Sequence, residues 1–285
     1  MYEDVGDPAA FLAGLEAGSR LIEAPMPHGG HMRFRQWGHG RPVILMHGSF
    51  GAWTHWTKNI EALVAAGYRV LGADTPGLGD SDPPPEGWDI RSIGALVAGA
   101  IDHALAPGER FYLAGFSFGG IVGGQAVRLL EARCDGFAIV GSNALGVRLN
   151  DSRPDLRKMR STMTPHEMKA VHRHNLGVIM FGDHGRIDEL ALHIQQRNTR
   201  KARIRSNTIP RGDSLRQVLT ELRLPVTGIF GEKDATAGPF MAERQELFES
   251  LPHATGFHLI DGAGHWVQYE RPDLVNPLLL DVLAG

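Results

Sequence analysis

Residues 111–124 read FYLAGFSFGGIVGG. The apolar run at 111–114 predicts a buried strand, and the apolar positions from Ile121 to Leu130 predict a helix. Ser117 therefore stands at the apex of a sharp turn between a strand and a helix. The pattern G-x-S-x-G in this setting is typical of a nucleophile elbow, a turn that exposes a reactive serine hydroxyl.

Crowding explains the glycines around this serine. A strand that turns directly into a helix forces its apex residue into a strained backbone conformation. Residues two positions to either side need almost no side chain; Gly115 and Gly119 meet that need, and Gly120 gives further clearance. The first amides of the following helix would direct N–H groups and the positive end of the helix dipole toward the hydroxyl.

The bulk composition fits one large α/β domain. The chain has 285 residues, of which 42% are hydrophobic and 21% are charged. Its net charge of −3, from 29 basic and 32 acidic residues, gives no indication of nucleic-acid binding. Cys134 is the single cysteine, so no intramolecular disulfide can form, and a structural role for this thiol is favoured.

The first residues carry no targeting pattern. Residues 1–7 include acidic side chains and no basic region before an apolar run, so we expect no secretory signal. No window has the uninterrupted apolar length that a membrane span needs. We expect a cytoplasmic protein that binds a small-molecule substrate, with neither nucleic acid nor membrane as a partner, and a homodimer is left open.

Apolar runs and turn residues predict an alternation of strands and helices. We expect strands at 20–26, 31–37, 42–47, 68–74, 111–114, 136–141, 225–231 and 256–261. We expect helices within 1–19 and 60–67, then at 89–105, 119–130, 166–176, 187–198, 215–222, 241–251 and 274–283. Almost wholly apolar strands that alternate with helices predict an α/β fold with a doubly wound, mainly parallel sheet, whose active groups lie at the carboxyl ends of the strands.

The alternation breaks after Ser142, where helical patterns replace the strands. We predict a helical lid at 144–211, inserted between a first core part at 1–143 and a second core part at 212–285. Residues 150–211 hold 13 Arg and Lys against 6 Asp and Glu, a net charge of +7, so the remainder of the chain carries −10. A basic lid docked on an acidic body is the favoured interpretation.

A sharper hypothesis gives some of this charge a role in recognition. One or two lid arginines would hold a substrate carboxylate, because the planar guanidinium matches a carboxylate with two parallel hydrogen bonds. The candidates are Arg157, Arg160, Arg173 and Arg197.

The side chains that would activate Ser117 follow two later strands. A serine hydroxyl needs a base to take its proton, and that base needs an orienting carboxylate. The loops after the last two predicted strands supply both, as Asp234 and His265. The order Ser117, Asp234, His265 is the one expected of an elbow hydrolase. Glu232 and Asp261 are rivals of Asp234, which we favour because it lies further past its strand.

Acyl transfer also needs donors for a developing oxyanion. We predict the backbone N–H of Phe118 as one donor and that of Ser49 as the other, with Phe50 as the next candidate after Ser49. The predicted substrate contacts are Phe50, Phe116 and Trp266. We predict neither a metal nor a cofactor, because the five lid histidines lack the carboxylate–histidine spacing of a zinc motif.

Several segments together resemble the α/β-hydrolase superfamily over nearly the full length of the chain. They are HGSFGAW at 47–53, DTPGLGDSD at 74–82, GFSFGG at 115–120, GEKD at 231–234 and GAGHW at 262–266. The resemblance implies the fold of that superfamily and a Ser–His–Asp triad. It implies much less about the substrate, because this fold hosts many reactions.

Two features narrow the reaction. Ser117, which is not an aspartate, argues against epoxide hydrolase and haloalkane dehalogenase chemistry. The sequence HWVQYE at 265–270 is similar to the end of meta-cleavage product hydrolases, which cut C–C bonds in dienoate acids. That family typically carries Asn before the serine and a glycine-rich oxyanion loop, where this chain has Phe116 and Ser49-Phe50.

The resulting hypothesis is a serine hydrolase that acts on a carboxylic ester or lactone of a small to medium, partly apolar substrate. One alternative is a C–C bond hydrolase of meta-cleavage-type keto acids. Another is a cofactor-free peroxidase or perhydrolase side activity. A third is a small-molecule receptor on a hydrolase fold, which would turn its ligand over slowly or not at all.

Overall fold

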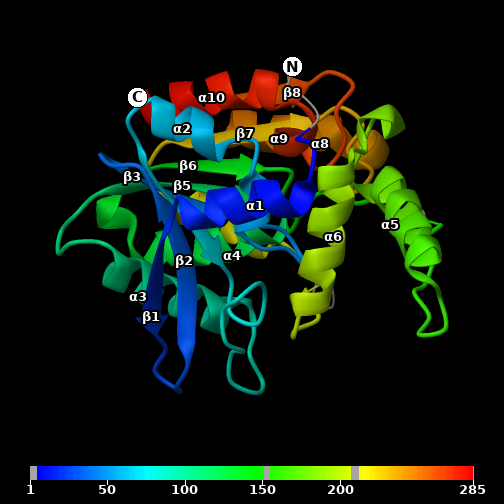
Figure 1. Ribbon diagram of the computed structural model, residues 1–285. Helices are drawn as coiled ribbons and strands as arrows, with labels where there is room; N and C mark the ends of the chain where they lie inside the picture. Colours follow the sequence, from blue (N-terminus) through cyan, green and yellow to red (C-terminus); the bar gives the residue numbers. More distant parts are fainter. Residues whose placement is uncertain (1–4, 151–154, 207–211, 285) are drawn as a thin grey trace.

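Eight strands form one sheet in the computed structural model, which describes residues 5–150, 155–206 and 212–284 (Figure 1). The strands are β1 (Arg20–Pro25), β2 (His31–Trp37), β3 (Pro42–Met46), β4 (Arg69–Asp74), β5 (Phe111–Phe116), β6 (Cys134–Val140), β7 (Val226–Gly231) and β8 (Ala254–Ile260). Their order across the sheet is β1-β2-β4-β3-β5-β6-β7-β8. The pairings of β2 with β1 and β4 are antiparallel, and the others are parallel. The predicted α/β fold with a mainly parallel, doubly wound sheet is confirmed.

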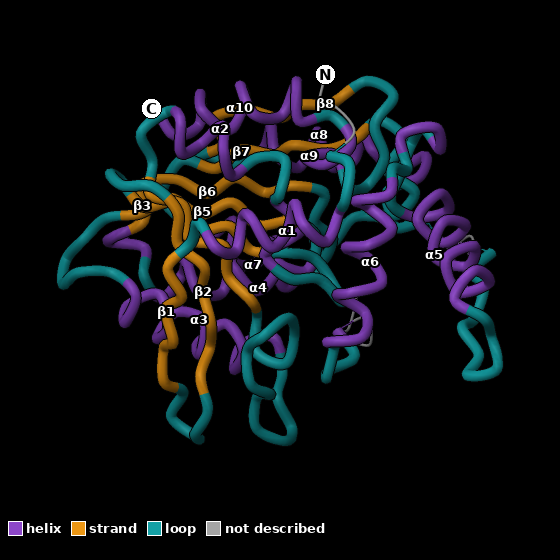
Figure 2. The backbone as a smooth tube through the Cα atoms, in the orientation of Figure 1, coloured by secondary structure: helices purple, strands orange, loops and turns teal. Residues whose placement is uncertain are grey.

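Helices connect the strands and lie outside the sheet (Figure 2). They are α1 (Pro8–Ala17), α2 (Ile60–Ala65), α3 (Ile90–Ala104), α4 (Phe118–Leu129), α5 (Pro165–Ile179), α6 (Glu189–Lys201), α7 (Ser214–Glu221), α8 (Met241–Ser250), α9 (Val267–Glu270) and α10 (Pro272–Ala284). In the described residues, no helix combines the length and the apolar character that crossing a membrane requires.

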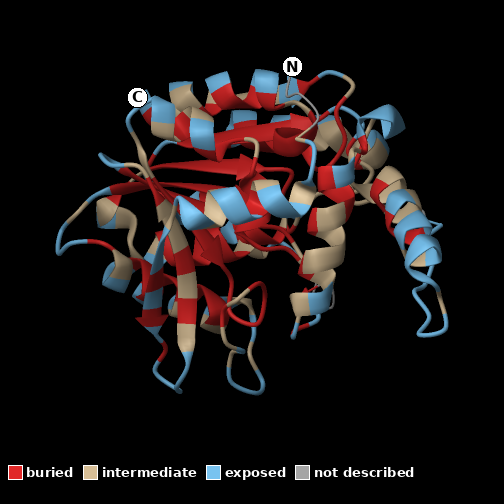
Figure 3. Cartoon of the chain, viewed as in Figure 1, coloured by how far each residue is buried: buried red, intermediate tan, exposed pale blue. Residues whose placement is uncertain are grey.

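The central strands contribute side chains to two separate cores, because successive residues of a strand point to opposite faces. In β3, Ile44 and Met46 join the core beneath α3, α4, α7 and α8. Val43 and Leu45 join the other core, which α1, α2, α6 and α10 cover. Figure 3 shows the result as buried strands between helices whose outer sides are exposed. The sheet is therefore covered on both faces, and its functional groups can meet at the strand ends.

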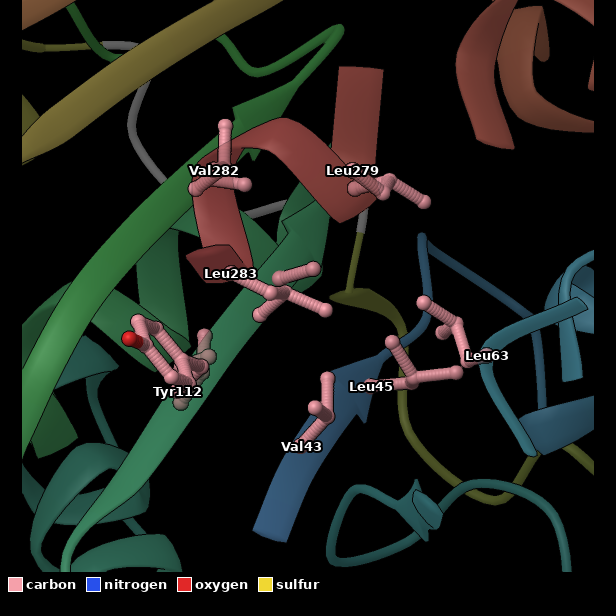
Figure 4. Close-up of a pocket in the computed structure, with 10 residues that line it drawn as sticks. Val43, Leu45, Leu63, Tyr112, Leu279, Val282 and Leu283 are labelled. Atoms are coloured by element: carbon pink, nitrogen blue, oxygen red, sulfur yellow. The ribbon is translucent and has the colours of Figure 1, made fainter. Parts of the chain in front are cut away.

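A small cavity remains in the second of these cores. It has a volume of about 10 Å³ and lies between β3, β5, α2 and α10, where Val43, Tyr112 and Leu279 are among its lining residues (Figure 4). This is room for about one water molecule within an almost wholly apolar lining. The cavity is therefore a gap in packing and not a substrate pocket.

The segment between β6 and α7 interrupts the alternation, as the sequence indicates. Its described residues form α5 and α6 and include no strand. Helix α6 packs beside α1, where Arg197 pairs with Glu16, whereas α5 stands at the outer edge of the molecule (Figure 1). The boundaries and the covering role of a lid at 144–211 stay predictions, and residues 151–154 and 207–211 of that range lie outside the described residues.

Several short helices are absent from the sequence prediction, among them the 3-10 helices Glu131–Arg133, His184–Arg186 and Gly238–Phe240. Two more are the 3-10 helix Trp53–Trp56 and helix α9. Contacts with distant segments hold both: the Trp53 amide donates to Asp74 Oδ1 at 2.8 Å, and the carboxylate of Glu270 in α9 accepts three backbone N–H groups of neighbouring loops. Local sequence patterns contain no signal for such contacts, which is why the prediction left these residues as loops.

Candidate active site

Ser117 lies at the turn between β5 and α4, with φ of 51° and ψ of −114°. This backbone conformation is strained for a residue with a side chain. A Cβ on Gly115 would lie 2.6 Å from the Cα of Gly120, and one on Gly119 would lie 2.6 Å from the backbone oxygens of Met46 and His47. The glycines are thus needed at the positions that the sequence pattern indicates, because strand, turn and helix touch there.

The structure brings Ser117, Asp234 and His265 together from three strand ends. His265 Nε2 lies 3.0 Å from Ser117 Oγ, and His265 Nδ1 lies 2.8 Å from Asp234 Oδ2. Both Asp234 and His265 are buried. The rival carboxylates lie elsewhere: Glu232 is exposed and accepts the Gly262 amide, and the Asp261 side chain is also exposed.

Asp234 is held in its ionised form. Burial alone would raise the pKa of this carboxyl group. The charge and hydrogen bond of His265, followed by the hydroxyl and amide of Thr236, outweigh burial and bring the pKa of Asp234 below its ordinary value. An ionised Asp234 accepts a hydrogen bond from His265 Nδ1, which leaves Nε2 as the ring nitrogen directed at the serine.

The loop after β3 lies directly against the elbow. A Cβ on Gly48 would meet the ring of Phe116 at 2.9 Å and the Cβ of Ser117 at 3.3 Å. Among the described residues, the amides of Ser49 and Phe118, the predicted oxyanion donors, have no protein acceptor. Both donors are thus available beside the serine, and their role in binding an oxyanion stays a prediction.

Two buried histidines that the prediction did not include hold this loop. The Thr75 amide donates to His47 Nε2 at 3.0 Å, so His47 carries its proton on Nδ1 and donates it to the Gly48 carbonyl at 2.8 Å. The Gly48 amide in turn donates to His55 Nδ1 at 3.3 Å. Burial lowers the pKa of His47 to about 4 and also lowers that of His55, so both imidazoles are neutral. The sequence feature that could have indicated this role is the position of both histidines in the loop motif at 47–55, HGSFGAWTH.

The three predicted substrate contacts differ in their surroundings. Phe50 is half-buried, has a positive φ of 53°, and donates its amide to Ser206 Oγ at 3.3 Å. Phe116 is buried with its ring centroid 5.1 Å from that of His265. Trp266 is fully buried, donates its indole N–H to the His55 carbonyl and stacks on Tyr269. Trp266 therefore packs beneath the site, and Phe50 is the only one of the three with substantial exposure.

The lid arginines proposed as carboxylate ligands have other surroundings. Arg173 pairs with Glu189 and donates to the Ile187 carbonyl, and Arg197 pairs with Glu16. The side chains at 157 and 160 are exposed. No group of three or more potential metal ligands of the His, Cys, Asp or Glu type occurs among the described residues.

Comparisons with known proteins agree with this geometry. A family model described as "Alpha/beta hydrolase family" matches residues 43–278. A 2-hydroxy-6-oxononadienedioate/2-hydroxy-6-oxononatrienedioate hydrolase of Cupriavidus pinatubonensis is 26% identical, over 85% of this chain and 86% of the relative. A 2-hydroxy-6-oxo-6-phenylhexa-2,4-dienoate hydrolase of Burkholderia cepacia is also 26% identical, over 87% and 89%. The crystal structure of a bromoperoxidase from Bacillus anthracis superposes with a TM-score of 0.73 at 21% identity, over 94% of this chain and 100% of that one.

Proposed function

The chain belongs to the alpha/beta hydrolase family, and we propose that within it the protein is a serine hydrolase with Ser117 as nucleophile. The observation that carries this proposal is the pair of contacts at His265, 3.0 Å to Ser117 Oγ and 2.8 Å to Asp234. These distances are those of a serine, a general base and the group that orients the base.

The first half of the reaction forms an acyl-enzyme. Ser117 Oγ attacks the carbonyl carbon of an ester or lactone while His265 Nε2 takes the hydroxyl proton. The imidazolium is stabilised by Asp234, and the amides of Ser49 and Phe118 donate to the developing oxyanion. The intermediate then collapses, and the bond to the leaving alcohol breaks as the alcohol takes the proton from His265.

The second half uses the same groups on water. His265 takes one proton from a water molecule, whose oxygen attacks the acyl carbon. The bond to Ser117 Oγ breaks, the serine recovers its proton from His265, and the carboxylic acid leaves. Electrons and protons balance in both halves without a cofactor.

The surroundings of the serine support an ester or lactone as the substrate. Buried Phe116 stands directly before Ser117, so the residue beside the nucleophile offers an apolar ring and no hydrogen bond. Two of the four proposed carboxylate ligands, Arg173 and Arg197, already pair with protein carboxylates. This arrangement favours a partly apolar, uncharged substrate.

Cleavage of a C–C bond is the second candidate. The relatives from Cupriavidus pinatubonensis and Burkholderia cepacia, named as hydrolases of oxo-dienoates, match this chain over 85% and 87% of its length. Ser117 Oγ would add to the ketone carbonyl of such an acid while His265 takes the hydroxyl proton. The C–C bond beside that carbonyl would then break, the leaving carbon would take the proton from His265, and water would release the acyl group as in the ester reaction. A carboxylate ligand would then have to come from arginines other than the two already paired.

A panel of p-nitrophenyl esters of increasing acyl length, assayed beside a meta-cleavage-type dienoate keto acid, tests both candidates. We expect turnover of the short or medium esters, and a loss of at least about a thousandfold in Ser117→Ala, because the nucleophile is gone. Much faster turnover of the keto acid would replace ester hydrolysis with C–C cleavage. Silence toward both, with no labelling of Ser117 by a fluorophosphonate, would contradict the hydrolase proposal and favour a receptor.

A further inference from the structure

The carboxylate of Asp234 has a second set of partners on the side away from His265. Thr236 donates to Asp234 Oδ1 twice, from its hydroxyl at 2.7 Å and from its backbone amide at 2.8 Å. The same hydroxyl lies 3.5 Å from His265 Nδ1. Thr236 therefore contacts both members of the Asp–His pair without facing the serine.

A second side chain fixes the hydroxyl of Thr236. Asn143, just after the buried Ser142, donates its Nδ2 to Thr236 Oγ1 at 3.2 Å. This donation occupies a lone pair of the hydroxyl oxygen, so the hydroxyl proton is directed to the remaining acceptor, Asp234.

A buried arginine fixes the amide of Asn143. Arg244 in α8 is 0% exposed, and its NH2 group donates to Asn143 Oδ1 at 3.1 Å. Because a guanidinium can only donate, the amide oxygen must face Arg244 and the amide nitrogen must face Thr236. The orientation of Asn143 thus follows from the chemistry of its neighbour.

This arginine is unusual because its charge is buried without a direct ion pair. In the described part of the chain, no carboxylate lies within ion-pair distance of Arg244, and its other contacts are the carbonyls of Arg148 and Phe240. Its Nε also has no partner among the described residues. A buried charge is costly unless something compensates it. The charges that face it are those of Asp234 and the more exposed Glu243.

Resting on the proposed hydrolase function, we propose that Arg244, Asn143 and Thr236 form a one-way chain of donors that positions Asp234 and fixes the tautomer of His265. Every hydrogen bond in the chain donates toward the carboxylate: Arg244 to Asn143, Asn143 to Thr236, and Thr236 to Asp234. Asp234 is then left as an acceptor only. The three residues are positioning residues, because none of them faces the serine hydroxyl.

The chain has a consequence for the base. With Oδ1 occupied by Thr236, only Oδ2 is left for His265, so the imidazole is held in the rotation that points Nε2 at Ser117. The charged or titratable groups around this pair are Asp234 itself, His55 on the opposite side, and Arg244 with Glu243 in α8. A change in any of these charges should therefore alter the acidic limb of the plot of kcat/KM against pH.

The first test removes only the hydroxyl of Thr236. Thr236→Val should lower kcat/KM about tenfold to a hundredfold with little change in KM, because the base is less well placed while the substrate groups remain. Thr236→Ser should recover most of the rate, since it restores the donor. The control is Thr227→Val in β7, where a buried threonine, more buried than Thr236, bonds Thr255 away from the Asp–His pair and should leave kcat/KM unchanged.

The second test separates positioning from stability. Asn143→Asp gives Arg244 a direct ion pair, so resistance to urea should be maintained or increased. Its carboxylate cannot donate to Thr236 and competes with Asp234 for the hydroxyl proton. We expect kcat/KM to fall at least tenfold, and the acidic limb of its pH profile to move upward by about half a pH unit or more, because a new negative charge favours the imidazolium. A merely structural network would instead keep the wild-type kcat/KM at the pH optimum in any variant that folds.

A measurement that needs no substrate distinguishes a failure of this proposal from a failure of the proposed function. The rate of Ser117 labelling by a fluorophosphonate and the NMR signal of the His265 Nδ1 proton are recorded for wild type, Thr236→Val, Asn143→Asp and Thr227→Val. Slower labelling and a displaced or exchange-broadened signal in the first two variants alone support the donor chain. Unchanged labelling and an unchanged signal in both would overturn it. If wild type itself is not labelled, the hydrolase proposal fails, and the NMR signal alone decides on the donor chain.

Discussion

At the scale of single residues, Asp74 shows how much free energy one buried group can store. It ends β4, and its carboxylate accepts the amides of Trp53 and Asp80, each at 2.8 Å. Burial is the largest influence and raises the pKa of Asp74 to about 6, although both hydrogen bonds oppose it. The group therefore binds a proton more tightly in the folded protein than in the unfolded chain.

The direction of the pH effect follows from this difference. Folded Asp74 takes up its proton near pH 6, whereas an unfolded aspartate, with its ordinary pKa of 3.8, does so in more acidic solution. Acidification from pH 7 to 4 should then stabilise wild type by about 2 kcal/mol relative to Asp74→Asn, which lacks the titrating group. Urea unfolding of both proteins at pH 7, 5.5 and 4 measures this difference.

Asp82 in the same loop gives a matched control. Its pKa is lowered by the His31 amide and the Arg33 charge, so Asp82→Asn should show the opposite and smaller trend. The measured quantity is the difference in the free energy of unfolding between each variant and wild type. The buried histidines destabilise all of these proteins equally on acidification, so their contribution cancels in that difference. A gap between wild type and Asp74→Asn that stays constant from pH 7 to 4 would refute the assignment.

At the scale of elements, two glycines in α3 should respond in opposite ways to the same substitution. A Cβ on buried Gly94 would lie 2.3 Å from the Cβ of Gln125 in α4, whereas a Cβ on Gly99 meets nothing within 4 Å. Gly94 is thus required by the close approach of two helices. Gly99 only lowers the helix propensity of α3.

We expect Gly94→Ala to reduce the free energy of unfolding by about 1–3 kcal/mol through overpacking. Gly99→Ala should raise it by about 0.5–1 kcal/mol. Chemical denaturation of the two variants checks both signs. If both substitutions stabilise the protein, α3 and α4 do not pack as closely as described.

An element could be predicted from the sequence where a local pattern of residues determines it, and could not where contacts between distant residues do. The strands were readable because a strand buried on both faces, such as β3, is apolar throughout. The elbow was readable because its glycines meet a local steric need. The 3-10 helix at 53–56 and the donor chain through Arg244 could not be predicted from the sequence, because each depends on contacts between residues far apart in it. No local pattern tells that Asn143 will lie between Thr236 and Arg244.

At the scale of the whole molecule, the apolar core around the small cavity and the candidate site lie at different places along the strands. The cavity beside Leu279 is lined in β5 by Tyr112, Leu113 and Ala114, whereas Ser117 lies just past the end of that strand. The three-residue step from Ala114 to Ser117 spans about 10 Å of strand. Damage to packing at the cavity should therefore leave the geometry at Ser117 in place.

Leu279→Ala should destabilise the protein by about 2–5 kcal/mol, because it enlarges an apolar cavity that already exists. Under the proposed function, kcat of the folded protein toward p-nitrophenyl esters should stay within about twofold of wild type. Leu274→Ala is the control, since Leu274 lies on the same helix but is 39% exposed. Thermal unfolding and activity of the two variants test the separation, and a large loss of kcat in Leu279→Ala at a temperature where it is folded would contradict it.

The bond between Ser117 and His265 joins positions 148 residues apart. It can form only after β7 and β8 have added to the growing edge of the sheet, because Asp234 and His265 follow those strands. A nascent or partly refolded chain can thus complete its elbow before the contact between Ser117 and His265 exists. Under the proposed mechanism, Ser117 should therefore become reactive toward a fluorophosphonate only when the last strands have joined the sheet, and the appearance of that reactivity would time the last step of folding.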